Sequence, residues 1–387
     1  MNKVCEHFGR CGGCKYLNIP YEQELSIKEN TLIDTLGEYG QFLKGLQPAP
    51  DVEGYRNKME LAFGDEGRDG RLALGMRKQR SFYEVATPEN CVLIPEDFKR
   101  VIMYVLEYFR ESGLDAFYHR KRHVGTLRHL VLRRGHFTGE ILLNLVTTST
   151  LATPIAPLVQ GLCGLALDGK IVGFLHSTND GVADVVKNEN VNILYGRDYY
   201  NEEIYGLKFK VSAFSFFQTN SEGAQKLYGL VRNYAAPAPR ENALAYDLYC
   251  GTGTIAQILS PSFTSVLGIE LIEDAIKAAK ENAALNSITN CSFYAGDVQD
   301  IIQQHPATPN VVVVDPPRDG LQPKALPHII ALNAPRLVYV ACKPASLARD
   351  LNLLTAVGYA VEKIEGMDMF PRTPHVEAIA LLRRVKA

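Results

Sequence analysis

The second half of the chain alternates short apolar runs with segments of helical spacing, and this alternation constrains the fold more than any other feature. Residues 311–314 are four valines in a row, typical of a strand buried on both faces, whereas residues 273–285 have a helical pattern. Because parallel strands need a crossover connection, usually a helix, the alternation predicts a parallel-rich α/β sheet with helices on its faces. The other apolar runs are residues 244–249, 266–269, 293–295, 337–340 and 378–382.

The residues before about position 216 have a different pattern, typical of antiparallel strands joined by hairpins. Residues 127–134 and 140–147 flank a turn-like segment that contains two glycines. Similar strand patterns lie at residues 59–63, 72–76, 171–174 and 207–211, and helical patterns at residues 21–39 and 96–112. We therefore expect a β-rich region over residues 1–215 and an α/β domain over residues 216–387.

Composition bounds the class of protein. The 387 residues are 46% hydrophobic, enough for the cores of two domains, and 41 basic residues nearly balance 43 acidic ones. Net charge therefore does not predict a nucleic-acid partner for the chain as a whole. No signal-peptide pattern and no apolar run long enough to span a bilayer is present, so we expect a cytoplasmic protein without a membrane partner. The 8 cysteines are then better read as thiols, metal ligands or catalysts than as disulfides.

One stretch is strongly basic. Residues 119–123 read His-Arg-Lys-Arg-His, Arg128, Arg133 and Arg134 follow, and no acidic residue occurs before Glu140. This concentration suits a local site for an anionic partner such as RNA phosphates, and it equally suits a solvated surface.

Cysteines cluster near the N-terminus. Cys5, Cys11 and Cys14 form a C-x5-C-x2-C pattern in a glycine-rich loop, and Cys91, in a turn-like stretch, is the candidate for a fourth ligand. Four thiolates suit either zinc or an iron-sulfur cluster, and the spacing does not separate them. The spacing differs from the C-x3-C-x2-C of radical S-adenosylmethionine enzymes, which argues against a reductive role.

The first apolar run of the α/β region ends in a glycine turn. Asp247 is followed by Leu-Tyr-Cys and then by Gly251-Thr-Gly253, and Glu270 ends the next run about 20 residues later. Glycines permit a tight turn against a ligand, and an acidic residue at that distance suits the hydroxyl groups of a ribose. An adenosine-containing cofactor is indicated. The missing third glycine of the dinucleotide motif favours S-adenosylmethionine over NAD.

Two further runs end in chemically useful residues. The four valines lead into Asp315-Pro316-Pro317, a rigid segment that places a carboxylate at the sheet edge. The run at 337–340 leads to Cys342, followed by Lys343, whose charge could raise the thiolate fraction of a nucleophilic cysteine. By itself, a cysteine at a strand end is more often a buried structural residue.

Taken together, these motifs resemble the S-adenosylmethionine-dependent RNA uracil-C5 methyltransferases over nearly the whole chain. The resemblance rests on the sequences Phe217-Gln-Thr-Asn, Asp247-Leu-Tyr-Cys-Gly, Asp315-Pro-Pro-Arg, the strand-end Cys342 and Phe370-Pro-Arg-Thr-Pro-His-Val-Glu377. It implies a Rossmann-like class I methyltransferase domain, a β-rich central domain and a [4Fe-4S] cluster. It also implies that the helix near residues 21–39 packs on the catalytic domain.

Each functional position follows from this resemblance. Cys342 matches the nucleophile and Glu377 the general base, and the cysteines at 5, 11, 14 and 91 match the cluster ligands of the bacterial ribosomal-RNA members. Positions of the cofactor pocket are matched by Gln218, Tyr249, Glu270 and Asp315, to which the glycine turn adds Gly251. Lys343 stands where many members have asparagine. The chain begins at the cluster cysteines with no TRAM-type domain before them, which makes it most similar to the short 23S ribosomal-RNA members.

The resemblance implies methylation of uracil carbon 5 in 23S ribosomal RNA through a covalent bond between Cys342 and carbon 6, after which Glu377 removes the carbon-5 proton. The target uridine must be unpaired or flipped out of its stack. We expect a structural role for the cluster and no obligate protein partner. The alternatives are the same chemistry on a T-loop uridine of transfer RNA, a non-catalytic RNA-binding or ribosome assembly protein, and a zinc-bound small-molecule methyltransferase.

Overall fold

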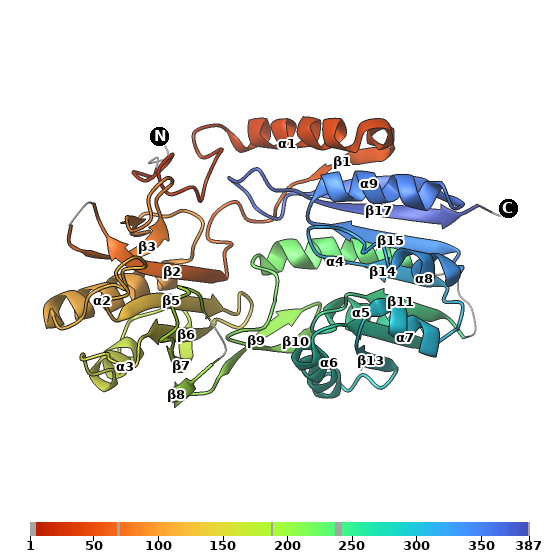
Figure 1. Ribbon diagram of the computed structural model, residues 1–387. Coiled ribbons are helices and arrows are strands. Elements are labelled where there is room, and N and C mark those ends of the chain that lie inside the picture. The colour runs from red at the N-terminus through yellow and green to blue at the C-terminus, as the bar shows by residue number, and fades with distance from the viewer. Residues whose placement is uncertain (1–4, 68–69, 187–188, 237–241, 386–387) are drawn as a thin grey trace. The chain divides into compact units, whose positions relative to one another are not determined.

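The computed structural model describes residues 5–67, 70–186, 189–236 and 242–385 (Figure 1). The chain divides into two compact units, each assembled from separate segments. The first unit comprises residues 1–18, 51–203 and 210–221, and the second comprises residues 19–50, 204–209 and 222–387. The sequence predicted a single boundary after residue 215. The structure differs, because residues 19–50 belong to the second unit although they precede most of the first.

The second unit is built on an eight-stranded sheet of order β1-β16-β17-β15-β14-β11-β12-β13. The pairs β11–β12, β11–β14, β12–β13, β14–β15 and β1–β16 are parallel, and only β17 runs antiparallel to its two neighbours. The strands are β1 (Leu43–Gln47), β11 (Leu244–Leu248), β12 (Ser265–Glu270), β13 (Cys291–Ala295), β14 (Val311–Val314), β15 (Arg336–Ala341), β16 (Tyr359–Met367) and β17 (Glu377–Arg384).

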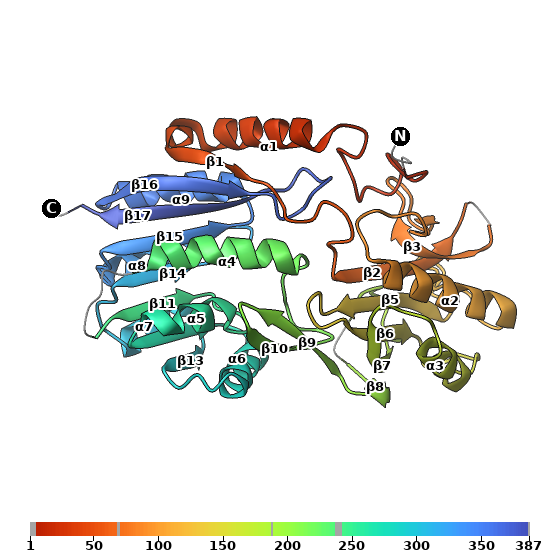
Figure 2. The same cartoon turned by 180° about the vertical axis from the view of Figure 1, so that it is seen from behind.

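Helices cover both faces of this sheet, and Figures 1 and 2 show α4 and α9 on opposite faces. The helices are α1 (Tyr21–Leu36), α4 (Ser221–Ala235), α5 (Thr254–Leu259), α6 (Glu273–Leu285), α7 (Val298–Gln304), α8 (Leu326–Ala331) and α9 (Pro344–Thr355), with 3₁₀ turns η1 (Gly37–Phe42) and η2 (Ser260–Ser262). All four valines of β14 are fully buried. This explains why the strand has no polar alternation.

Helix α1 packs within the second unit although it lies near the N-terminus. Leu32 and Leu36 join the core that includes β14 and β15, and Tyr39 Oη donates to Asn352 Oδ1 at 2.9 Å. The helical pattern was predicted to run to residue 39. The α-helix ends at Leu36 because Gly37 adopts a positive φ of 58°, after which the chain continues as a 3₁₀ turn.

The first unit is built on a seven-stranded sheet of order β4-β3-β2-β5-β6-β7-β8, antiparallel except for the parallel pair β6–β7. Its strands are β2 (Lys58–Asp65), β3 (Leu72–Arg77), β4 (Val85–Ala86), β5 (Leu127–Arg134), β6 (Glu140–Thr147), β7 (Lys170–Thr178) and β8 (Val191–Gly196), with helices α2 (Glu96–Ser112) and α3 (Ala156–Cys163). The apolar face of α2 packs on this sheet. A separate two-stranded sheet, β9 (Tyr199–Ile204) and β10 (Leu207–Ser212), contributes residues to both units.

None of the helices in the described residues has the length and apolar character needed to cross a bilayer.

Candidate active site

The predicted catalytic and cofactor residues of the second unit meet at one edge of its sheet. Strands β11, β12, β14 and β15 are parallel neighbours, so their carboxyl ends lie together, and antiparallel β17 begins at the same edge. Tyr249, Glu270, Asp315 and Cys342 end or directly follow these strands, and Glu377 starts β17. In open α/β sheets this edge is where ligands bind.

Cys342 lies opposite Glu377. Ala341 pairs with Ala378 across β15 and β17, and the antiparallel register continued by one residue sets Cys342 against Glu377. Burial, then the negative charges of Glu377 and Asp315, raise the pKa of the Cys342 thiol to about 11. The cation that most opposes this rise is Arg318. Arg318 follows the Asp-Pro-Pro segment, whereas Lys343, which the sequence suggested for that role, occupies the N-cap position of α9, and its effect on the thiol stays a prediction.

Two carboxyl groups, those of Asp247 and Glu377, are buried along this edge, and that of Asp315 is partly buried. Glu377 is 4% exposed, and burial followed by the charge of Asp315 raises its pKa to about 8, again against Arg318. Burial raises the pKa of Asp315 to about 7, and burial raises that of Asp247 well above its usual range. Asp247 Oδ2 accepts from Ala256 N–H at 2.9 Å, which holds the start of α5. Such clustering of perturbed acids beside a thiol is typical of a catalytic site.

The glycine turn after β11 has the left-handed backbone that a close ligand approach requires. Tyr249, Gly251 and Gly253 have φ values of 66°, 52° and 76°, and a Cβ at Gly253 would meet Phe293 at 2.7 Å. Glu270 joins this turn because its Oε2 accepts from Gly251 N–H at 3.2 Å while its Oε1 accepts from Ile272 N–H at 3.0 Å.

An apolar surface lies beside Glu270. Leu271 and Ile272 are 62% and 58% exposed directly after β12. Exposed apolar groups beside an acidic strand end suit a nucleoside, whose ribose hydroxyls would bond the carboxylate while the base contacts the aliphatic side chains. The residues present therefore fit the adenosine part of S-adenosylmethionine. The two apolar residues after Glu270 were the signal in the sequence, and the motif-based prediction of the pocket did not include them.

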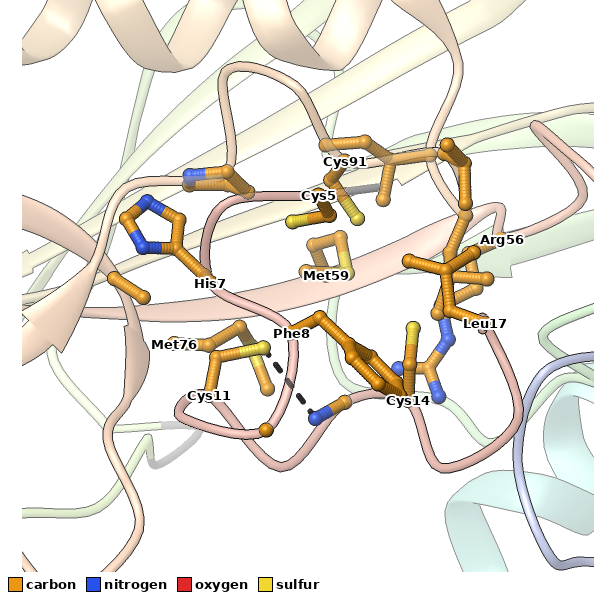
Figure 3. Close-up of a pocket in the computed structure, with 17 residues that line it drawn as sticks. Cys5, His7, Phe8, Cys11, Cys14, Leu17, Arg56, Met59, Met76 and Cys91 are labelled. Carbon is orange, nitrogen blue, oxygen red and sulfur yellow. Dashed lines mark hydrogen bonds between the residues drawn. The ribbon is translucent and has the colours of Figure 1, made fainter. Parts of the chain in front are cut away.

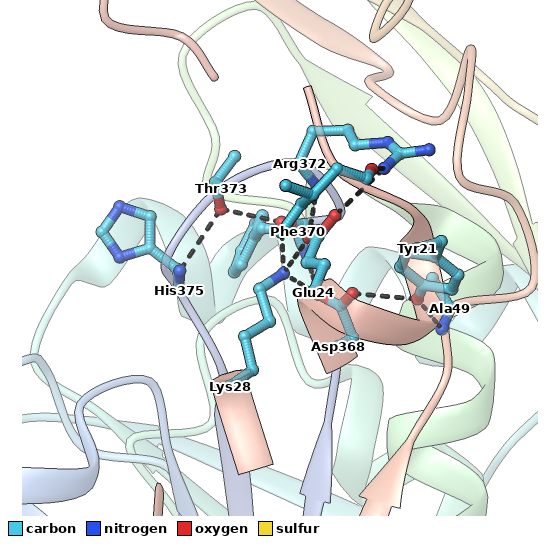
Figure 4. A network of polar contacts seen from close by, with 10 residues as sticks. Tyr21, Glu24, Lys28, Ala49, Asp368, Phe370, Arg372, Thr373 and His375 are labelled. Atoms are coloured by element: carbon cyan, nitrogen blue, oxygen red, sulfur yellow. Dashed lines mark hydrogen bonds and ion pairs between the residues drawn. The ribbon is translucent and has the colours of Figure 1, made fainter. Parts of the chain in front are cut away.

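A buried ionic network holds the segment that leads into Glu377 (Figure 4). Lys28 Nζ of α1 donates to Glu24 Oε1 at 2.6 Å, to Asp368 Oδ1 at 2.8 Å and to the carbonyl oxygen of Phe370 at 3.2 Å. Glu24 Oε1 also accepts from the backbone N–H of Arg372 at 2.6 Å. Arg372 has a φ of 68°, so this hydrogen bond stabilises a backbone conformation that is unfavourable for a residue with a side chain. Helix α1 thereby fixes the loop before the candidate base.

The four predicted cluster cysteines lie in the first unit and line one cavity (Figure 3). Burial and then the charges of Cys91, Cys11 and Cys5 raise the pKa of Cys14 to about 12. The N–H of Gly13 donates to Cys11 Sγ at 3.4 Å. Such N–H bonds favour thiolates over thiols, as a metal site requires.

Gln218 belongs to the first unit, where its carbonyl oxygen accepts from Asn57 Nδ2 at 2.9 Å. Its place in the cofactor pocket stays a prediction.

The basic stretch is only partly a surface. Arg128 and Arg133 are 1% and 2% exposed, and their guanidinium groups donate to the carbonyl oxygens of Gly181 and Ser215, both at 2.6 Å. Arg134 pairs with Asp97 at 3.1 Å. These three arginines are structural, which corrects their inclusion in an anion site. The exposed cations of the stretch are Lys121 and Arg122, whereas Arg120 is half-buried and pairs with Asp184 at 2.8 Å.

Comparison with known proteins identifies the class. Residues 240–364 match a methyltransferase domain family. Over 99% of this chain and 85% of the relative, the sequence is 46% identical to an uncharacterized RNA methyltransferase of Caldanaerobacter subterraneus subsp. tengcongensis. It is 44% identical to another from Clostridium tetani, over 98% of this chain and 83% of the relative.

A solved structure is similar as well. The Pyrococcus abyssi tRNA (uracil-54, C5)-methyltransferase, in complex with S-adenosyl-L-homocysteine, matches with a TM-score of 0.79 and 27% identity over 96% of this chain and 85% of that one. The chain belongs to the RNA methyltransferases. It is an enzyme that uses S-adenosylmethionine and acts on RNA, and the expected Rossmann-like α/β domain and β-rich N-terminal sheet are confirmed.

Proposed function

We propose that this enzyme methylates carbon 5 of uracil in RNA, with Cys342 as the nucleophile and Glu377 as the general base. The observation that carries the proposal is the register of β15 and β17, which sets a thiol opposite a buried carboxyl group at the edge where the cofactor turn lies. Likeness to a tRNA (uracil-54, C5)-methyltransferase supports the same reaction class.

The chemistry requires both residues. Carbon 5 of uracil is a poor nucleophile, and addition of the Cys342 thiolate to carbon 6 converts the ring to an enolate whose carbon 5 can attack. The bound sulfonium cofactor supplies the methyl group. Glu377 then takes the proton from carbon 5, the carbon 5–carbon 6 double bond re-forms, and the thiolate leaves carbon 6.

Cys342 and Glu377 must each lose a proton before they can act, and both bind it tightly. With pKa values of about 11 and about 8, Cys342 and Glu377 both hold a proton at neutral pH. Arg318 favours the ionised form of each. We assign Arg318 the role of stabilising the anion at this edge, first the thiolate and then the carboxylate.

The proposed target is 23S ribosomal RNA. Its support is the set of Cys5, Cys11, Cys14 and Cys91, which resembles the cluster ligands of ribosomal-RNA members. Transfer RNA is the second candidate, favoured by the likeness to the Pyrococcus abyssi enzyme. Labelled methyl transfer to each unmodified RNA in parallel distinguishes them.

We further propose that the four cysteines hold a [4Fe-4S] cluster with a structural role. Its support is that Cys5, Cys11, Cys14 and Cys91 line one cavity and match the cluster ligands of the ribosomal-RNA members. Analysis of iron, acid-labile sulfide and zinc in protein purified without oxygen tests this, and one equivalent of zinc without iron would contradict it.

RNA substituted with 5-fluorouridine tests the covalent mechanism. Fluorine at carbon 5 cannot be removed as a proton, so the adduct should accumulate as a complex that survives denaturing electrophoresis. We expect this complex with the wild-type enzyme and S-adenosylmethionine, and none with Cys342→Ala. A complex that forms equally with Cys342→Ala would overturn the assignment of the nucleophile.

A further inference from the structure

A second feature of the first unit is not used by the reaction chemistry. Three segments, residues 77–84, 117–124 and 179–186, meet around the carboxylate of Asp184, whose side chain is 4% exposed. Arg77 and Arg120 contact Asp184 Oδ2 at 2.6 Å and 2.8 Å, and His129 Nε2 lies 2.9 Å from Oδ1.

More positive charge gathers here than the carboxylate neutralises. Arg128 also approaches Asp184 Oδ1, at 3.8 Å, so three arginines share one acid. Burial and then the charge of Arg120 lower the pKa of Arg77, as expected where cations crowd together. Of the other acids in these loops, Glu84 pairs with Lys78 at 3.2 Å, and Asp180 accepts from Ser149 N–H at 2.8 Å.

Aromatic rings lie on the same loops. Phe82 is 66% exposed, and Lys121 Nζ lies 5.9 Å from the centre of its ring. The Tyr83 ring stacks on His119 at 4.2 Å with an angle of 23° between the planes. The backbone carbonyl of Phe82 accepts from Arg77 Nη1 at 2.7 Å, which ties the exposed ring to the Asp184 centre. An exposed ring held in place beside cations is costly to leave in water and is suited to stacking with a flat partner.

We propose that these loops form an anchoring surface for single-stranded RNA, separate in its chemistry from uracil methylation. We call it the aromatic–basic surface, made of Phe82, Tyr83, His119, Arg120, Lys121 and Arg122. Bases stack on the exposed ring of Phe82, and phosphates bind the exposed cations of Lys121 and Arg122. The inference rests on the proposed function only in taking RNA as the partner.

A duplex fits this surface less well. Stacking on Phe82 requires an unstacked base, which single strands and loops offer and a paired helix does not. We expect binding at this surface to be independent of RNA sequence, because every base has a flat face that can stack.

Binding of labelled oligoadenylate RNA, measured by fluorescence anisotropy over a series of salt concentrations, tests the inference. Oligoadenylate contains no uracil, so its affinity does not depend on the target base. We expect Phe82→Ala to raise the Kd by about 5- to 150-fold, the range for loss of one base stack. The double variant Lys121→Ala/Arg122→Ala should reduce the slope of log K against log salt by about 0.7 for each phosphate that it no longer binds.

Matched controls exist on the same sheet. Phe137, 43% exposed, lies in the turn after β5, and the loop 117–124 precedes that strand. Lys170, whose N–H donates to the carbonyl oxygen of Gly139 at 2.9 Å, starts β7, and the loop 179–186 follows β7. Both controls are therefore at the opposite ends of these strands. Phe137→Ala and Lys170→Ala should bind oligoadenylate as the wild type does.

The outcomes separate this surface from the methylation proposal. Wild-type methylation together with unchanged oligoadenylate binding by Phe82→Ala and by the double variant would overturn the surface and leave the reaction standing. Weaker binding by those variants would support the surface even if no uracil were methylated. Equal competition by duplex RNA would overturn the stacking of a single strand.

Discussion

Cys342 and Glu377 lie opposite each other across β15 and β17, one residue beyond the paired Ala341 and Ala378. Helix α9 and strand β16 separate the two residues in sequence, and β17 then inserts between β15 and β16. The insertion of one antiparallel strand into an otherwise parallel region brings an acid from the start of β17 to the end of β15. The thiol and the acid are thereby on the same edge as the cofactor turn.

Replacing Glu377 by glutamine should separate the two halves of the reaction. The amide keeps the shape but cannot take the carbon-5 proton, so methyl transfer should occur once and the covalent RNA adduct should persist. General-base removal typically costs about 10²- to 10⁴-fold, and we expect the turnover number to fall by this amount. Denaturing electrophoresis with labelled RNA measures the adduct.

Glu362→Gln is the matched control, because Glu362 pairs with Arg383 on the same sheet and is 37% exposed. It should turn over normally. A Glu377→Gln enzyme with normal turnover would show that another group removes the proton.

The pH dependence of product release should follow the ionisation of Glu377. Its pKa is raised to about 8, so the carboxylate that acts as the base is populated only as the pH rises through that value. The rate of product release from the adduct should increase as the pH is raised from about two units below this pKa to about one unit above it. Rapid-quench measurement with a preformed adduct isolates this step, and a profile that is flat across this range would contradict the assignment.

Glu377 should also make the stability of the folded protein depend on pH: the rate of product release rises with pH, whereas the stability falls. The folded-state pKa of Glu377 lies above its ordinary value of 4.5, so the folded protein holds a proton that the unfolded chain has lost between pH 4.5 and about 8. The stability contribution is therefore fully present below this window and is lost as the pH rises through it. Urea unfolding should show a shallower decline with pH for Glu377→Gln than for the wild type, and identical slopes would argue against a buried, protonated acid.

Most strand ends could be predicted from the sequence, because a strand buried on both faces leaves a short apolar run that ends where the polar residue begins. This held for Asp315 after four valines and for Cys342 after β15. The partnership of Cys342 with Glu377 could not be derived from spacing, since it depends on the order of strands in the sheet. The pairing of these two residues was predicted only from the resemblance to the uracil-C5 methyltransferases.

The sequence did not predict which charged residues are buried in the core. Hydrophobic periodicity identified α1 as an amphipathic helix but gave no sign that Glu24 and Lys28 are 0% and 2% exposed. Asp368, which accepts from Lys28, lies near the other end of the chain. For the same reason, Arg128 and Arg133 were taken as surface cations, although a guanidinium group can be buried when carbonyl oxygens accept its protons.

Removing the charge of Lys28 should destabilise the second unit. Lys28→Met leaves the buried carboxylate of Asp368 without its cation and leaves Glu24 with only the longer pair to Arg372 at 3.4 Å, and breaking a buried pair in this way costs about 3–5 kcal/mol. The substitution also removes the hydrogen bond to the Phe370 carbonyl oxygen, so the loop before Glu377 should loosen and turnover should fall. Urea unfolding and single-turnover assays measure the two effects.

Lys44→Met controls for the substitution itself, since Lys44 is an exposed residue of β1 in the same unit. It should be neutral in both assays. Wild-type stability of Lys28→Met would show that the network in Figure 4 does not hold this loop.

Replacing Cys11 by serine should weaken RNA binding more than cofactor binding. The carbonyl oxygen of Arg10, in the cysteine loop, accepts from Gln79 N–H at 2.7 Å, and Gln79 belongs to the loop that carries Phe82. Loss of a ligand should lower iron content and loosen this connection, whereas the glycine turn lies in the second unit. Iron analysis, oligoadenylate anisotropy and calorimetric titration with S-adenosylhomocysteine measure the three properties.

Cys163→Ser is the matched control, because Cys163 is an exposed cysteine of α3 in the same unit. It should retain iron and RNA affinity. A Cys11→Ser protein that binds RNA normally but has lost catalysis would assign the cluster a part in the reaction and contradict a structural role.

The most direct measurement is methyl transfer from labelled S-adenosylmethionine to unmodified 23S ribosomal RNA and unmodified transfer RNA, followed by nucleoside analysis. We predict label as 5-methyluridine in ribosomal RNA, abolished by Cys342→Ala. Label in transfer RNA alone would keep the roles of Cys342 and Glu377 and overturn the target. Label in another nucleoside, or none in either RNA with cluster-loaded enzyme, would contradict the proposed reaction.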